Sequence, residues 1–175
     1  ATHTTALPTF NANGGLAGFT VNQGDILITG NGLNGTAQQI LDLVSRSVRI
    51  DGNINAQDLG VFAGAQQWRY DTRGVTGAAA PQGSAPVYAI DSSALGGMYA
   101  NRIRLVSTGA GVGVRMLGNA AANGQDFSLS AAGRIELNNA ISAQRDILLA
   151  STSNDAAALA LTDAALTSGR DTKLD

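Results

Sequence analysis

A short unit that recurs every 20 to 25 residues constrains the fold of this chain more than any other feature. The unit has a small or amide residue, one or two polar residues, and then an apolar–x–apolar triplet. It occurs as NQGDILI (22–28), NAQDLGV (55–61), YANRIRL (99–105), NGQDFSL (123–129), SAQRDILL (142–149) and TSGRDTKL (167–174). From Phe127 to Ile147 is 20 residues, and from Ile147 to Thr172 is 25. A period of this length with short strands is typical of a parallel β-helix.

Further strand-like runs lie between these units, which predicts two or three strands per period. They are SVRI (47–50), VGVRML (112–117), GRIEL (133–137) and ALAL (158–161). At this spacing the chain would form about seven coils, each placed on the coil before at roughly 4.8 Å. The inward side chains would stack into one apolar core, and they include Ile103, Leu105, Ile135, Leu137, Ile147 and Leu149. The sequence therefore predicts an all-β solenoid formed by residues 1–175 as a single domain.

The composition agrees with this fold and excludes several function classes. Charged residues make up 14% of the chain and aromatic residues 5%, and there are 22 glycines, which disfavours a helical bundle. The net charge of −2 comes without a basic stripe, so we expect no nucleic-acid partner. Because the chain has no cysteine, disulfides and thiolate metal sites are impossible. We expect no cofactor and no bound metal.

One interval is too long for a coil and predicts an excursion from the solenoid over residues 64–88. The 44 residues from Leu59 to Ile103 contain GAQQWRYDTRGVTGAAAPQGSAP (64–86), which reads like a surface loop or hairpin. A second long interval, 33 residues, separates Ile26 from Leu59. The excursion holds Trp68, Arg69 and Tyr70, a candidate contact for a partner or a glycan. Alternatively, their rings fix the excursion on the solenoid by burying aromatic surface.

Residues 25–51 also match a dinucleotide-binding fingerprint. A short apolar run leads to Gly30, Gly32 and Gly35, and after a stretch with helical spacing a second apolar run ends at Asp51. A Rossmann sheet needs further β–α units, and no convincing helix follows Asp51. We therefore interpret the glycines as turn residues between strands.

An enzyme is the alternative from another class, since parallel β-helices also carry polysaccharide lyases and hydrolases. Asp58, Asp126 and Asp146 precede strands in equivalent repeat positions and could form a column of carboxylates. Turn aspartates more often accept backbone hydrogen bonds at corners. His3 is the sole histidine and lies near the start, which argues against a Ser-His-Asp triad or a histidine metal centre. We expect no enzymatic activity.

Two longer stretches resemble the secretion domain of two-partner-secretion exoproteins, which include filamentous haemagglutinin-like adhesins and contact-dependent growth-inhibition proteins. They are ILDLVSRSVRIDGNINAQDLGVFAGAQQWRYD (40–71) and YAIDSSALGGMYANRIRLVSTGAGVGVRMLG (88–118). The resemblance covers about residues 12 to 140, and residues 140–175 look like the start of haemagglutinin-type repeats.

The resemblance implies a right-handed parallel β-helix from a much longer exported exoprotein. It implies an outer-membrane β-barrel transporter as partner, and a host or target-cell receptor or glycan as a further one. It also implies a location outside a Gram-negative cell, reached through the periplasm. The main functional interpretation is a structural secretion domain of an adhesin, and the alternative is the shaft base of a growth-inhibition toxin. The family's Asn-Pro-Asn motif and capping strands are expected to be missing, which predicts an uncapped first coil.

Overall fold

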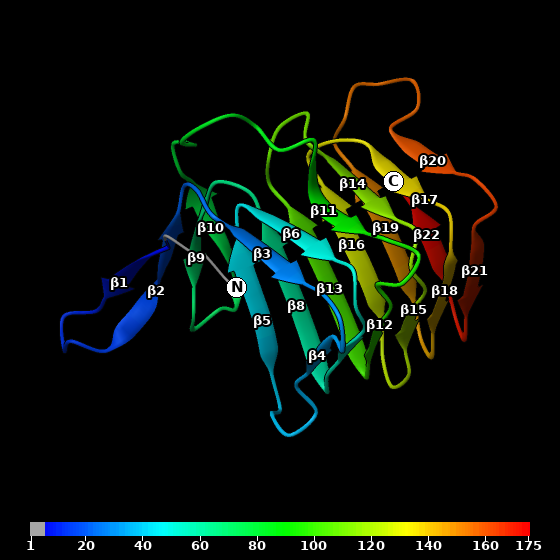
Figure 1. Cartoon of the computed structure of the whole chain (residues 1–175), viewed down its shortest axis with the longest axis horizontal. Coiled ribbons are helices and arrows are strands. Elements are labelled where there is room, and N and C mark those ends of the chain that lie inside the picture. The colour runs from blue at the N-terminus through cyan, green and yellow to red at the C-terminus, as the bar shows by residue number, and fades with distance from the viewer. Residues whose placement is uncertain (1–5) are drawn as a thin grey trace.

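The computed structural model describes residues 6–175 and folds them into strands joined by turns, without a helix in that range (Figure 1). His3 lies outside the described residues. The strands form three parallel sheets of six strands each and one antiparallel sheet of four strands. The described residues include no helix that is long and apolar enough to cross a membrane.

The three parallel sheets are the faces of the solenoid and are named here in chain order. Sheet 1 contains β3 (Asp25–Ile28), β6 (Ser47–Ile50), β11 (Tyr88–Ser92), β14 (Gly113–Met116), β17 (Ile135–Leu137) and β20 (Leu159–Leu161). Sheet 2 contains β4 (Leu33–Asn34), β7 (Ile54–Asn55), β12 (Met98–Ala100), β15 (Ala120–Ala122), β18 (Ala140–Ala143) and β21 (Ala165–Ser168). Sheet 3 contains β5 (Leu41–Ser45), β8 (Asp58–Ala63), β13 (Arg102–Ser107), β16 (Phe127–Ala131), β19 (Ile147–Ser151) and β22 (Thr172–Leu174).

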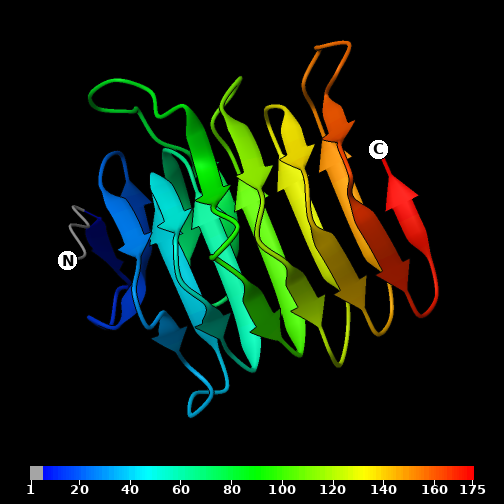
Figure 2. The ribbon, with the colours of Figure 1, turned by 45° about the vertical axis from the view of Figure 1, so that its right-hand side comes forward.

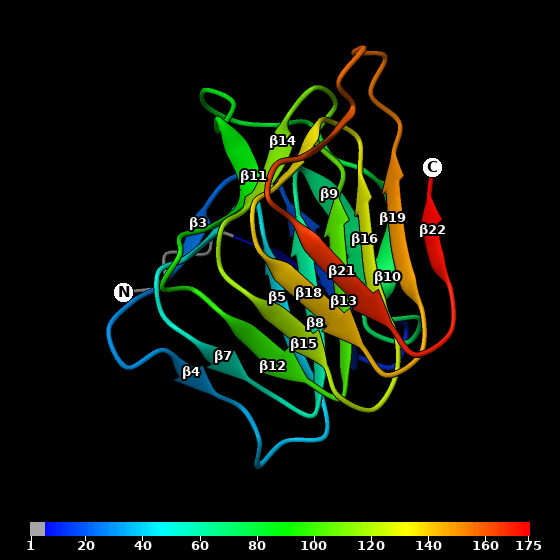
Figure 3. The same ribbon diagram turned by 90° about the vertical axis from the view of Figure 1, so that its right-hand side faces the viewer.

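Each coil contributes one strand to each sheet, and the chain winds as a right-handed parallel β-helix (Figures 2 and 3). The predicted fold class is therefore confirmed. The structure has six coils instead of the expected seven, because the N-terminal strands and the excursion after β8 lie outside the solenoid. The first repeat unit, at 22–28, also lies on another face than the later units. Ile26 of β3 pairs with Val48 of β6 in sheet 1, whereas the partner of Leu59 in the first coil is Leu41. The 33-residue interval before Leu59 therefore compares strands of two different sheets, and it contains no segment outside the solenoid.

The core consists of inward side chains that stack in register from coil to coil. One column in sheet 3 runs through Leu43, Val61, Leu105, Leu129 and Leu149, which pair successively in the parallel ladder. The parallel ladder places such side chains about 4.8 Å apart, so each contacts the one before and the one after. All six residues predicted to point inward are at most 1% exposed, namely Ile103, Leu105, Ile135, Leu137, Ile147 and Leu149.

Two glycines of the apparent nucleotide fingerprint, Gly30 and Gly32, lie in the turn between sheets 1 and 2, and Gly35 follows β4 on the way to sheet 3. Gly30 and Gly32 have φ values of 62° and 77°, in the left-handed region that glycine adopts without a steric penalty. A Cβ atom at Gly32 would lie 2.0 Å from the carbonyl oxygen of Asn53 in the next coil. Close stacking of adjacent coils therefore requires glycine at position 32. The dinucleotide interpretation is excluded, because the stretch that should be a helix in such a motif contains strand β5.

The fourth sheet lies outside the solenoid and combines the N-terminal strands with the predicted excursion. Its order is β1 (Leu7–Phe10), β2 (Leu16–Val21), β9 (Gln66–Arg69) and β10 (Gly74–Ala78), all antiparallel. We call it the extra-helical sheet. A loop over residues 79–87 returns the chain to the solenoid, and Tyr88 already belongs to β11. Strands β9 and β10 thus form a hairpin that pairs with β2.

The two ends of the solenoid differ in exposure. Ile26 and Ile28 of the first coil are each 7% exposed, whereas Leu161 and Leu174 of the last coil are 40% and 47% exposed. Strands β1 and β2 lie beside the first coil at the N-terminal end (Figures 1 and 2). Strands β1 and β2 belong to the extra-helical sheet, where β2 pairs with β9, so the expectation that the family's capping strands are missing stays a prediction.

Neighbouring residues of β19 test the stacking model. Leu149 is 1% exposed in the core, and Leu148 on the outer face is 40% exposed. We expect Leu149→Ala to lower the free energy of unfolding by about 2–5 kcal/mol through the cavity it leaves, and Leu148→Ala to change it by less than about 1 kcal/mol. Urea unfolding followed by circular dichroism measures both. Equal effects of the two substitutions would contradict the assigned register.

Candidate functional site on the extra-helical sheet

The extra-helical sheet covers the outer face of sheet 3 over the first coils. Phe62 of β8 lies between the inward residues Val61 and Ala63 and therefore points outward, yet it is only 1% exposed. Its ring lies 5.8 Å from that of Trp68 in β9. Gln66, which is fully buried, donates from Nε2 to the carbonyl oxygen of Phe62 at 2.9 Å. An apolar contact and a buried hydrogen bond thus attach the excursion to the solenoid.

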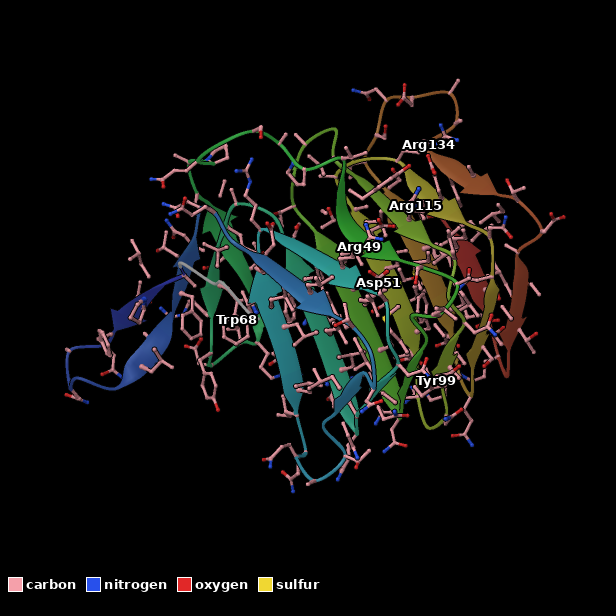
Figure 4. The ribbon with its side chains drawn as sticks, in the orientation of Figure 1. Arg49, Asp51, Trp68, Tyr99, Arg115 and Arg134 are labelled. Atoms are coloured by element: carbon pink, nitrogen blue, oxygen red, sulfur yellow. The ribbon has the colours of Figure 1, made fainter. Side chains whose placement is uncertain are left out.

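Trp68, labelled in Figure 4, is the centre of an aromatic cluster formed by residues of β2, β8 and β9 and the following turn. Its ring centroid lies 6.0 Å from that of Phe19 in β2 and 6.2 Å from that of Tyr70, in addition to the contact with Phe62. Centroid distances in this range are typical of stabilising aromatic pairs. Because Trp68 is only 2% exposed, its indole serves packing, and it does not present a surface to a partner.

Arg69 and Tyr70 have the opposite exposure. The Arg69 side chain is half-exposed and pairs with Asp71 at 2.6 Å, and Tyr70 is 62% exposed. The predicted trio is therefore divided, with one residue buried under the excursion and two at the surface beside it. Trp68 packs the excursion onto the solenoid, and the Tyr70 ring is accessible, but a contact of this ring with a partner or a glycan stays a prediction.

Arg73 in the turn of the hairpin forms the most elaborate ion pair of the described residues. Its Nη2 donates to Asp42 Oδ1 at 2.7 Å and its Nε to Asp42 Oδ2 at 2.9 Å, while Nη1 donates to Asp58 Oδ2 at 3.1 Å. Arg102 donates to the same oxygen of Asp58. Arg73 has a φ of 45°, which is strained for a residue other than glycine. Because Nη2 also donates to Asp58 Oδ1 at 3.3 Å, Arg73 contacts both carboxylates bidentately and holds this turn over sheet 3.

The electrostatics of this cluster lower the pKa of Asp58. Burial raises the pKa of the Asp58 carboxyl, but hydrogen bonds from Arg73 and Arg102 and their positive charges outweigh burial, so the pKa lies below its usual value. The hydrogen bond to Asp42 raises the pKa of Arg73 above its already high value. Sequence reasoning missed Arg73 and Asp42 because their contact joins the excursion to the first coil. The only sequence signal for this contact was that Asp42 and Asp58 each lie in or beside a strand-like apolar run.

The aspartates expected to form a column are interrupted by Arg102, which lies between Asp58 and Asp126, and each carboxylate makes a structural contact. Asp58, Arg102, Asp126 and Asp146 hold equivalent positions of sheet 3 in successive coils. Asp126 accepts a hydrogen bond from the backbone N–H of Asp146 at 3.2 Å, and Asp146 accepts one from that of Asp171 at 3.2 Å. The corner interpretation is thus confirmed for these two aspartates, since each binds the backbone of the next coil.

The outer face of sheet 1 carries a second ladder of charges with alternating sign. Arg49, Asp91, Arg115 and Glu136 occupy one register position in four successive coils. Arg115 donates to both carboxylate oxygens of Asp91, at 2.8 and 2.9 Å, and its guanidinium lies over the Tyr88 ring. Figure 4 shows Arg49 and Arg115 along this face. Alternating signs stabilise the stack, because like charges directly opposite one another would repel.

These features define a parallel β-solenoid with stacked ion pairs on its outer faces and an extra-helical sheet held at its N-terminal end. The family model of the TPS secretion domain matches residues 1–137. The chain therefore belongs to the TPS secretion domain family. Proteins of this family are secreted or cell-surface proteins of Gram-negative bacteria that pass through the periplasm.

Solved and curated proteins agree with this assignment. A crystal structure of the filamentous hemagglutinin secretion domain superimposes with a TM-score of 0.83 at 32% identity, over 98% of this chain and 58% of that chain. The 16S rRNA endonuclease CdiA of Enterobacter cloacae is 45% identical over 140 residues, which is 80% of this chain. The tRNA nuclease CdiA-2 of Burkholderia pseudomallei is 47% identical over 137 residues. The matched region is 4% of the length of each CdiA protein.

The Arg73 cluster predicts that the extra-helical sheet loosens in acid. A carboxyl whose pKa is lowered by folding stabilises the native state above its unfolded pKa, and this contribution is lost as the pH falls through the folded pKa. We therefore expect Trp68 emission to be constant from neutral pH down to about 4 and to shift to the red below it. In Asp58→Asn the emission should already be shifted at neutral pH and depend less on pH. Asp155→Asn, in an exposed loop, is the control, and equal titrations of all three proteins would contradict the prediction.

Proposed function

We propose that this chain is the structural secretion domain of a large exoprotein and that an outer-membrane β-barrel transporter recognises it. The observation that carries this proposal is the match of residues 1–137 to the TPS secretion domain. The CdiA relatives support a much longer parent protein, because the matched region is 4% of their length. We further propose that residues 140–175 begin the haemagglutinin-type repeats. The constant register of the last two coils across this boundary supports that assignment.

Recognition in the extended state and folding outside the outer membrane would then be successive steps. Every coil buries its inward side chains on the preceding coil, as the column ending in Leu129 and Leu149 illustrates. Burial of apolar surface contributes roughly 25 cal/mol per Å². Each coil that emerges and stacks therefore gains free energy, which opposes return of the chain into the transporter.

The shaft base of a contact-dependent growth-inhibition toxin is a second candidate function, beside the adhesin. Two CdiA proteins, named as nucleases, are 45% and 47% identical to this chain, against 32% for the filamentous hemagglutinin structure. The comparison thus favours the toxin alternative. We propose no catalytic role for residues 6–175 themselves. Asp58, Asp126 and Asp146 are held by arginines or backbone N–H groups, and no cluster of metal-binding side chains occurs in this range.

Deleting the domain tests the proposed function directly. In cells that express the full-length exoprotein and the transporter encoded with it, we expect removal of residues 6–137 to abolish surface display, measured by antibody binding to intact cells. The matched control removes a similar length of downstream repeat, which should shorten the shaft without blocking export. Export that is undiminished by the first deletion would overturn the proposal.

The surface residues beside Trp68 form the candidate contact, for the transporter or for a glycan. We propose that Arg69 and Tyr70 make this contact while Trp68 positions them. The double variant Arg69→Ala and Tyr70→Ala should fold like the wild type, since both side chains are exposed, but bind the transporter's periplasmic domains or a glycan array several-fold more weakly. Leu95→Ala, at a residue 78% exposed elsewhere, is the control. Unchanged binding to both probes would exclude this contact.

A further inference from the structure

The loop that follows the extra-helical sheet encloses an apolar cavity of about 310 Å³ against the solenoid. Its floor is the corner between sheets 3 and 1 in the first three coils, where Arg46, Gly64 and Thr108 follow paired strands. Its other wall is the segment from β10 to β11, seen in green in Figure 1. Most lining residues are small or apolar and include Ala65, Ala79, Pro81, Pro86, Ala89 and Val112. This volume is at the lower end of the range for small-ligand pockets.

A buried cation without a counter-ion lines this cavity. Arg46 is 9% exposed, and no carboxylate of residues 6–175 lies within 4 Å of its guanidinium. Residues 1–5 contain no acidic side chain. Asp25 lines the adjoining hollow together with Arg46, but its carboxylate accepts a hydrogen bond from Ser47 at 2.6 Å instead. Most other arginines of the chain, although more exposed, pair with an aspartate or with Glu136.

The hydrogen bonds of Arg46 leave most of its donors unused. A guanidinium has five N–H groups, and one Nη1–H is donated to the carbonyl oxygen of Gln82 in the loop. None of the Arg46 nitrogens is both buried and without a partner, so the remaining N–H groups are accessible to a ligand, and a guanidinium is never neutral in a protein. A planar anion that accepts two parallel hydrogen bonds would satisfy these donors, and a carboxylate has this geometry. The apolar walls, in turn, favour an aliphatic group attached to it.

We propose that this cavity binds a small carboxylate with a short apolar tail. The carboxylate pairs with Arg46, and the tail lies against Ala79, Ala89 and Val112. Either a free alkanoate or the carboxyl-terminal residue of a polypeptide supplies this chemistry. The site lies on a different part of the surface from Arg69 and Tyr70. The proposed carboxylate site does not depend on the proposed secretion function. A substitution can therefore abolish ligand binding and leave export intact, or the reverse.

Titration of the folded chain with hexanoate, followed by nuclear magnetic resonance, tests the site. We expect saturable shifts at Ala89 and Val112, and about tenfold or more weaker binding of hexanol, which lacks the charge. Arg46→Met should weaken hexanoate binding to a similar degree. Arg104→Met is the matched control, because Arg104 also has no carboxylate within 4 Å among the described residues but lies exposed over Phe62. It should bind like the wild type.

A second variant keeps the test decisive if Arg46→Met does not fold. Ala79→Leu fills the cavity from the loop and retains Arg46, so it should also abolish hexanoate binding. Equal binding of hexanoate and hexanol, unchanged binding by Arg46→Met or Ala79→Leu, or no saturation by the wild type at millimolar hexanoate would overturn the assignment. N-acetyl-leucine and its amide compare the two sources. Tighter binding of N-acetyl-leucine than of hexanoate identifies a polypeptide terminus, and the reverse order identifies an alkanoate.

Discussion

The stacking of inward apolar side chains at the strand spacing is the interaction on which the whole structure depends. Columns such as Leu43–Val61–Leu105–Leu129–Leu149 require that every coil repeat the same register in sheet 3. A slip by one residue would exchange the inner and outer faces and place Leu148 in the core instead of Leu149. The parallel hydrogen-bond ladders and the apolar columns therefore enforce one another. The outer charge ladders can form only because this register is kept.

The outer faces add specificity to this core without supplying most of its stability. Exposed ion pairs contribute at most about 1 kcal/mol each, but here they stack in rows. Alternation of Arg49, Asp91, Arg115 and Glu136 places opposite charges on adjacent coils. The aspartates at the start of the sheet 3 strands hold the backbone of the following coil. Such contacts favour the native order of coils over a shifted one.

The extra-helical sheet relates the fold to its proposed role. It ties the segment before the first coil to a hairpin inserted after the second, through pairing of β2 with β9. The Trp68 cluster and the Arg73 ion pairs then hold this sheet on the solenoid. The sheet thus lies on the outer face of sheet 3 beside the first two coils.

The sequence by itself determined the fold class and the inward residues, because a repeat of about twenty residues imposes the same local constraint in every coil. Ile135 and Ile147, for example, were assigned to the core from the repeat alone. The phase of the first coil and the roles of Arg46 and Arg73 were decided by the tertiary structure. The unit at 22–28 resembles the later ones locally, and only pairing with Val48 shows that it belongs to sheet 1. Arg73 meets Asp42 across 31 residues, and Arg46 meets Gln82 across 36. Contacts of that range depend on where an irregular excursion returns to the solenoid, and periodicity carries no information about such a path.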